Sequence, residues 1–132
     1  MSSILKRLAA GIRRAGKPAR SRRPVIVCGL NYHAYRLLAE LAGSREYRVL
    51  ALVDDEPWNH ATDMQGVRVY YPSEVVSLVK RHGVVAVVHG DARDIACFDA
   101  ATRAELAERG VPFVAIDAAE EAEQRLASAL SR

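Results

Sequence analysis

The stretch "VIVCGLNYHAYRLL", residues 25–38, decides the fold, because an apolar run passes through a glycine into a helical pattern. Branched and aliphatic residues before the glycine predict a buried strand, and the spaced leucines after it predict an amphipathic helix. A strand–turn–helix corner of this kind is where dinucleotide-binding domains carry the pattern G-x-G-x-x-G. The chain places Gly29, Asn31 and Ala34 at the three glycine positions.

The substitutions in this pattern leave two interpretations open. Gly29 permits the sharp turn, and alanine at the third position still allows close helix–strand packing. We expect Asn31 to tolerate left-handed backbone geometry, although its side chain takes up space where the backbone meets a pyrophosphate. The start of the helix favours anions, and His33 adds a charge or a hydrogen bond. The corner is either a nucleotide site that tolerates substitution or a shape retained without a ligand.

Strand-like and helical patterns alternate along the rest of the chain. Further strands are expected at 47–55, 67–71, 84–91 and 111–117, and helices at about 33–43, 72–83, 95–109 and 118–130. This alternation predicts a single α/β domain with a doubly wound parallel sheet. Right-handed crossovers make the first strand central, and the strand order reverses between it and the strand 84–91.

Ligands bind such sheets at that reversal, outside the carboxyl ends of the strands. The stretches that meet there supply these candidate cofactor-binding residues: Gly29, Leu30, Asn31, Tyr32, His33, Asp54, Asp55, His89 and Gly90. An acid at the end of the second strand accepts hydrogen bonds from an adenosine ribose and repels a 2′-phosphate, which favours NAD over NADP. An aspartate turn leading into the next loop explains the two acids equally well. His89 either contacts the second half of the ligand or lies in solvent at the end of its strand.

No catalytic or metal-binding set is visible in the sequence. The four histidines and two cysteines lack a metal-ligand spacing, and no Tyr-x-x-x-Lys pair, G-x-S-x-G elbow or phosphate-binding P-loop occurs. We therefore expect a non-catalytic module without a metal. Cys28 in an apolar strand and Cys97 on a helix predict reduced thiols in a cytoplasmic protein, and a disulfide between them is the alternative.

Charge divides the chain into a basic arm, residues 1–23, and an acidic domain, residues 24–132. The arm holds eight of the 19 basic residues and no acid, which leaves 11 basic against 16 acidic residues in the domain. Apolar residues at helical spacing among the cations predict an arm that docks on an anionic membrane surface or a partner protein. A solvated, disordered tail is the alternative. The acidic domain argues against a nucleic-acid partner, and homo-oligomerisation stays open.

Three stretches carry a resemblance to a known family: "VIVCGLNYHAYRLLAEL", "EYRVLALVDDEPW" and "MQGVRVYYPSEVVSLVKRHGVVAVV". Across residues 24–90 the chain resembles the amino-terminal nucleotide-binding region of the nucleoside-diphosphate-sugar epimerase/dehydratases of bacterial polysaccharide biosynthesis. The resemblance implies a Rossmann-like fold, with Gly29 and Asn31 on the glycine-rich turn and Asp54 and Asp55 at the acidic strand end. In that family a membrane-spanning section and a basic linker precede this region, which implies a location at the membrane periphery. The same half-motif is similar to nucleotide-binding domains of redox-sensing repressors and sugar-modifying acyltransferases.

Overall fold

Strands and helices alternate along the chain, as the sequence pattern predicts. The computed structural model describes residues 22–117 and 121–131. The strands are β1 (Arg23–Cys28), β2 (Tyr47–Val53), β3 (Asp63–Met64), β4 (Val67–Tyr70), β5 (Ala86–His89) and β6 (Phe113–Ala115). The α-helices are α2 (Tyr32–Ala42), α3 (Val75–His82), α4 (Ala100–Glu108) and α5 (Ala122–Leu130). Short 3-10 turns form η2 (Pro57–Asn59), η3 (Pro72–Glu74) and η4 (Ala92–Ile95).

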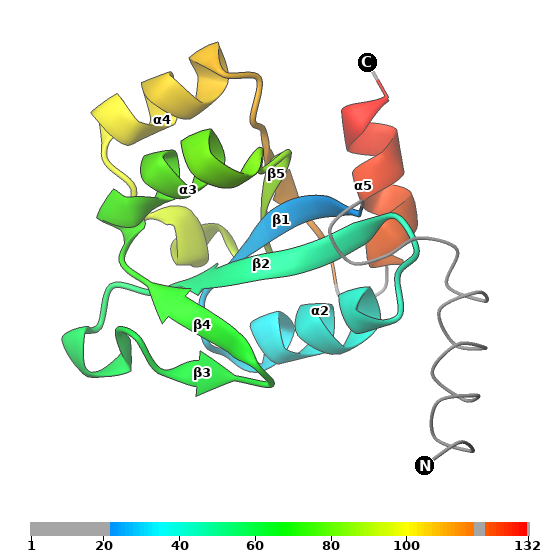
Figure 1. Cartoon of the computed structure of the whole chain (residues 1–132), viewed down its shortest axis with the longest axis horizontal. Coiled ribbons are helices and arrows are strands. Elements are labelled where there is room, and N and C mark those ends of the chain that lie inside the picture. The colour runs from blue at the N-terminus through cyan, green and yellow to red at the C-terminus, as the bar shows by residue number, and fades with distance from the viewer. Residues whose placement is uncertain (1–21, 118–120, 132) are drawn as a thin grey trace.

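The strands form one six-stranded sheet in the order β3-β4-β2-β1-β5-β6. Neighbouring strands are parallel except β3 and β4, which form an antiparallel hairpin. The chain leaves the central β1 first toward β2 and later toward β5, so the strand order reverses between β1 and β5 (Figure 1). The predicted doubly wound α/β domain is confirmed, and the arrangement is Rossmann-like.

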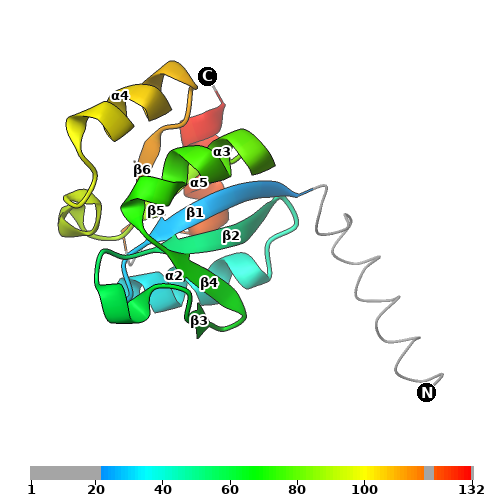
Figure 2. The ribbon, with the colours of Figure 1, turned by 60° about the vertical axis from the view of Figure 1, so that its left-hand side comes forward.

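Helices cover both faces of this sheet. Figure 2 shows α2 and α5 on one face and α3 and α4 on the other. The side chains of Val25 and Val27 pack with α2 and α5, whereas those of Ile26 and Cys28 pack with α3 and α4. All four side chains are fully buried. Successive residues of a strand point to opposite faces, so a strand covered on both sides requires an unbroken apolar run. That requirement explains why the opening stretch of sequence determines the centre of the fold.

The segment between β5 and β6 differs from the prediction. We expected one helix over 95–109, but the chain forms η4 first and begins α4 only at Ala100. Two aspartates account for the interruption, because Asp91 caps η4 and Asp99 caps α4 through side-chain bonds to backbone N–H groups. The separate turn brings η4 against the carboxyl end of β1.

Most of the predicted arm lies outside the described residues, which begin at residue 22. Arg22 and Arg23, which we assigned to the arm, belong to the folded domain. The guanidinium of Arg22 donates to the carbonyl of Ser44 at 3.1 Å, and Arg23 begins β1. No helix in the described ranges is long and apolar enough to cross a membrane. Of the predicted terminal helix, α5 covers Ala122–Leu130, and residues 118–120 lie outside the described part.

Candidate functional site

The glycine turn joins β1 to α2 at the point where the strand order reverses. Gly29 has a φ of +95°, and its N–H donates to the carbonyl of Val53 at 2.8 Å, which ties the turn to the end of β2. Asn31 has a φ of −99°, so the turn does not use the left-handed geometry that an asparagine tolerates. Its side-chain oxygen instead accepts from the N–H of Ala34 at 3.0 Å and caps α2. Extended backbone is the usual geometry of such a cap, and the glycine supplies the positive φ that the turn needs.

Asp94 of η4 lies directly over this turn. The amide nitrogen of Asn31 donates to Oδ1 of Asp94 at 3.0 Å. A Cβ atom built on Gly29 would lie 2.8 Å from Cγ of Asp94, so only glycine leaves room for the carboxylate. Sequence reasoning missed Asp94. The available signal was "HGDARD", in which Asp91 is a capping residue that starts a turn before the expected helix.

A polar pocket of about 240 Å³ opens between the ends of β1 and β2 and the η4 segment. Its lining residues are Gly29, Val53, Asp54, Asp55, Arg93, Asp94, Ala96 and Cys97. The pocket therefore combines the predicted glycine and the two predicted acids with a segment that follows β5. This convergence is what the reversal in strand order requires.

The two acids after β2 have different surroundings. Oδ2 of Asp54 accepts from the N–H of Glu56 at 3.2 Å and from the side-chain amide of Asn59 at 3.0 Å, so it holds the following loop. Asp55 is exposed at the pocket. The aspartate-turn interpretation thus describes Asp54, whereas the carboxylate of Asp55 stands open to a ligand.

Arg93 is the cation at this pocket, and its side chain is exposed. Its guanidinium donates to the carboxylate of Asp91 at 3.0 Å. Hydrogen bonds from the Arg93 side chain and, second in effect, from its backbone N–H hold the pKa of the Asp91 carboxyl below its ordinary value. The pair lies at the protein surface, beside the cap that Asp91 forms on η4.

The remaining candidates lie around the pocket rather than in its lining. Leu30 packs against the core on the α2 face, and Tyr32 is 71% exposed. His33 packs on Gly90, where a Cβ would come within 2.6 Å of the Cβ of His33, so this contact requires glycine. His89 is only 7% exposed, and its Nδ1 lies 3.2 Å from the carbonyl oxygen of Asp91. Burial is the main cause that lowers the pKa of His89, which keeps the ring neutral inside the domain.

Both cysteines lie at this end of the sheet as free thiols. Cys97 lines the pocket, and its Sγ lies 3.7 Å from the carbonyl oxygen of Asp94. Burial raises the pKa of Cys97 and raises that of Cys28 well above its ordinary value, so both thiols stay protonated near neutral pH. Within residues 22–117 and 121–131 no group of three or more His, Cys, Asp or Glu side chains is arranged to hold a metal ion.

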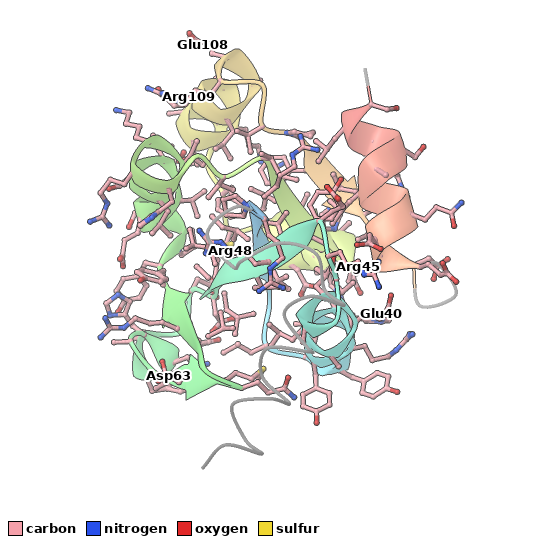
Figure 3. The ribbon with its side chains drawn as sticks, turned by 45° about the vertical axis from the view of Figure 1, so that its right-hand side comes forward. Glu40, Arg45, Arg48, Asp63, Glu108 and Arg109 are labelled. Carbon is pink, nitrogen blue, oxygen red and sulfur yellow. The ribbon has the colours of Figure 1, made fainter. Side chains whose placement is uncertain are left out.

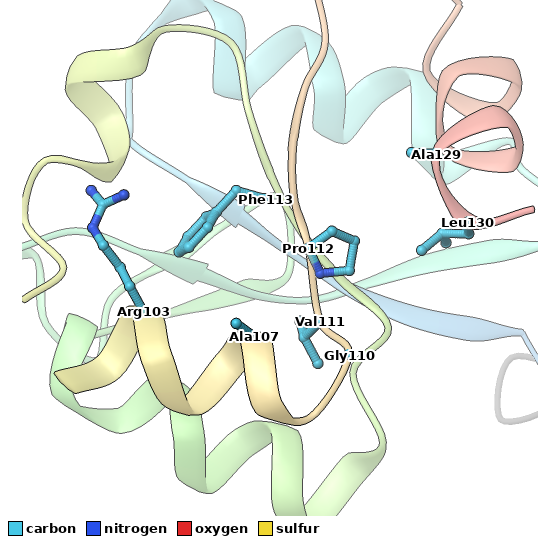
Figure 4. A pocket seen from close by; sticks show the side chains of 8 residues that line it. All are labelled: Arg103, Ala107, Gly110, Val111, Pro112, Phe113, Ala129 and Leu130. Carbon is cyan, nitrogen blue, oxygen red and sulfur yellow. The ribbon is translucent and has the colours of Figure 1, made fainter. Parts of the chain in front are cut away.

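A larger, mostly apolar pocket of about 520 Å³ lies between α4, β6 and α5 (Figure 4). Gly110, Val111 and Pro112, just before β6, line it, so it lies toward the amino ends of the strands. Its cation, Arg103, donates to the carbonyl of Phe98 at 3.1 Å and lies over the ring of Phe113 at 5.3 Å. The arginine is thus part of the packing, and we place the candidate site at the opposite end, where the strand order reverses.

Comparisons with known proteins bear on the fold. No protein-family model matches the chain, and no curated protein matches its sequence. A UDP-D-quinovosamine 4-dehydrogenase from Vibrio fischeri is similar in structure, with 21% identity, a TM-score of 0.58, and coverage of 83% of this chain and 87% of that one. RSP, a Rex-family repressor, aligns with 16% identity and a TM-score of 0.58 over 87% of this chain and 54% of its own.

RSP has also been solved with ligands. Its complex with β-NADH aligns with 15% identity and a TM-score of 0.56 over 80% of this chain and 52% of that one. Its complex with β-NAD⁺ and operator DNA aligns with 13% identity and a TM-score of 0.54 over 88% and 54%. The chain thus spans about half the length of the repressor. Identities this low show a shared fold, which agrees with the sheet order described above.

Proposed function

We propose that this chain is a non-catalytic nucleotide-binding module for NAD or a sugar nucleotide, in envelope polysaccharide biosynthesis. The observation that carries the proposal is the Gly29 turn at the N-terminus of α2, beside the acidic end of β2. The N–H groups at the start of a helix point outward and stabilise a phosphate. The fold is shared with a UDP-sugar dehydrogenase and with a repressor solved with β-NADH, which supports this ligand class.

In this proposal the carboxylate of Asp55 binds the ribose of the nucleotide. Its carboxylate is exposed at the pocket and can accept hydrogen bonds from both ribose hydroxyls, whereas Asp54 shapes the loop. A 2′-phosphate would meet the same negative charge, so NAD binds better than NADP. Arg93 also lines the pocket, and its exposed guanidinium has further N–H donors for phosphate oxygens besides those bonded to Asp91.

The lining of the pocket favours binding over reaction. Its one thiol, Cys97, has a pKa raised by burial, so it is a poor nucleophile. Its other titratable groups are three aspartates and an arginine that is already paired with Asp91. An acid–base pair of the kind that moves protons would need a group with a pKa near the working pH.

An interaction domain with a vestigial site is the second candidate function. The specific observation in its favour is that Asn31 and Asp94 bond to each other over the turn, close to the backbone that a phosphate would have to approach. Such a domain would dock on an anionic membrane surface or a partner protein through residues 1–23.

Titration calorimetry of the full chain with NAD, NADP and a UDP-sugar separates the two candidates. We expect NAD to bind with a Kd in the micromolar to millimolar range, about −4 to −8 kcal/mol. Asp55→Asn should weaken NAD binding about tenfold and NADP binding less, because the carboxylate reads the 2′-hydroxyl. Asp63→Asn should change neither, because it is an equal loss of charge on β3 (Figure 3), at a residue outside the pocket lining. Absence of binding by every nucleotide at millimolar concentration would favour the interaction domain.

A further inference from the structure

The carboxylate of Asp94 occupies the space in front of the glycine turn. Its Cγ and Oδ1 both lie 2.8 Å from the position of a Cβ on Gly29, and Oδ1 accepts the amide hydrogen of Asn31 at 3.0 Å. In this fold the missing glycine side chain is what lets a ligand's phosphate chain pass close to the backbone. A negatively charged group of the protein therefore stands where a negatively charged group of the ligand would pass.

The η4 segment holds that carboxylate in place. The N–H of Asp94 donates to the carbonyl of Asp91 at 2.9 Å, and the N–H of Ala96 donates to the carbonyl of Arg93 at 3.2 Å. The second oxygen, Oδ2, is buried and has no hydrogen-bond partner in the described part of the chain. A buried carboxylate oxygen without a hydrogen-bond donor is costly, so moving the side chain of Asp94 away from the turn regains hydration for Oδ2.

From this geometry we infer that Asp94 is a specificity-determining residue of the candidate site, which selects against anionic groups at the glycine turn. The inference rests on the proposed nucleotide-binding function and adds a ligand preference to it. A diphosphate can enter only when η4 and the carboxylate of Asp94 move away from the turn, whereas an uncharged nucleoside meets no like charge there. Like charges brought together at a desolvated surface strongly disfavour association. The wild-type site therefore binds the nucleoside part of its ligand better than the diphosphate part.

The test compares adenosine, ADP and NAD on the full-length wild type, Asp94→Asn and Asp94→Ala. Asparagine keeps the size of the side chain and removes its charge, and its amide group can donate to a phosphate oxygen. We expect ADP and NAD to bind Asp94→Asn at least tenfold more tightly than the wild type, with adenosine changed by less than about threefold. Asp94→Ala should show the same selective gain. Glu108→Gln, an equal loss of charge at the far end of α4 (Figure 3), should leave all three affinities unchanged.

Hydrogen exchange measures the displacement of η4 by a ligand in the wild-type protein. Saturating NAD should speed the exchange of the amide hydrogens of Asp94 and Ala96, because their bonds within η4 must open when the diphosphate enters. Slower exchange at both positions would contradict the inference.

The outcomes separate this inference from the proposed function. If NAD binds the wild type and both variants equally, the inference is overturned and nucleotide binding stands. If Asp94→Asn gains affinity for adenosine as much as for ADP, the side chain acts by bulk and not by charge, which also overturns the inference. If no ligand binds any of the proteins at millimolar concentration, the proposed function fails and the inference falls with it.

Discussion

At the scale of single residues, the position of Gly29 requires glycine for two reasons. Its φ of +95° favours glycine, and the carboxylate of Asp94 approaches within 2.8 Å of where a side chain would begin. Gly66 shares only the first requirement, because it has a φ of +82° but no atom within 4 Å of its Cβ position. The two glycines therefore form a matched pair for separating backbone strain from steric contact.

We expect Gly66→Ala to destabilise the domain by about 1–2 kcal/mol, the usual cost of a left-handed backbone for alanine. Gly29→Ala should cost about 1–3 kcal/mol more, because Asp94 must also move. Urea unfolding of the two variants measures the difference, and a double-mutant cycle with Asp94→Ala assigns the excess to this contact. Equal destabilisation by the two glycine substitutions would mean that η4 does not rest on the turn.

Residues whose roles are local could be predicted, and those that depend on distant contacts could not. The glycine turn follows from the sequence pattern at the end of β1, and the two acids follow from the pattern at the end of β2. Asp94 meets Asn31 across 63 positions of sequence, and no periodicity reports where two such side chains point. The sequence pattern likewise did not predict the role of Asn31, whose side chain caps α2 and binds Asp94 while its backbone stays extended.

Among the helices and strands, apolar runs predicted the strands of the sheet, whereas the bounds of one helix depended on capping side chains. The run "VIVC" became part of β1, and "YRVLALV" became β2. Helices cover both faces of β1, so an unbroken apolar run suits that strand. The expected helix over 95–109 was wrong, since capping aspartates divided it into η4 and α4. Caps act through individual side chains, so they change an element without changing the apolar period around it.

Helix α5 is fastened to the domain by reciprocal carboxylate contacts. Glu40 of α2 accepts from the N–H of Ala122 at 2.9 Å and so caps the start of α5 (Figure 3). In return, Oε2 of Glu123 on α5 accepts from the hydroxyl of Ser44 at 2.5 Å and from the N–H of Arg45 at 3.2 Å. The hydrogen bond from Ser44 is the main cause that lowers the pKa of Glu123. The ionised carboxylate therefore holds α5 on the turn between α2 and β2.

Glu123→Gln should cost about 1 kcal/mol of unfolding free energy at neutral pH, because the amide keeps one acceptor but loses the charge. The folded-state pKa of Glu123 lies below its unfolded value, so this advantage of the wild type is present above the unfolded pKa. It is lost as the pH falls through the lowered folded pKa. Urea unfolding near neutral pH and at about pH 3 tests this, and the two proteins should converge in acid. Glu121→Gln, whose side chain makes no capping bond to α5, is the control and should match the wild type at both pH values.

At the scale of the whole molecule, opposite charges are separated along the chain. The full chain has a net charge of +3, and its first 21 residues contain six of the basic residues and no acid. Residues 22–132 therefore carry a net charge of −3, with 13 basic and 16 acidic residues. The domain alone would be repelled by an anionic surface, so any attraction to one has to come from the first 21 residues.

We expect the full chain to sediment with vesicles that contain phosphatidylserine and to be released at about 1 M salt, where charges are screened within about 3 Å. A variant that lacks residues 1–21 should stay in solution, because its net charge is reversed. It should unfold at the same temperature as the full chain, since the contact of Arg22 with Ser44 and the whole of β1 remain. Vesicles of phosphatidylcholine alone are the control and should bind neither protein. Equal sedimentation of both proteins with the anionic vesicles would place membrane attachment on the domain and would contradict the assignment of docking to the arm.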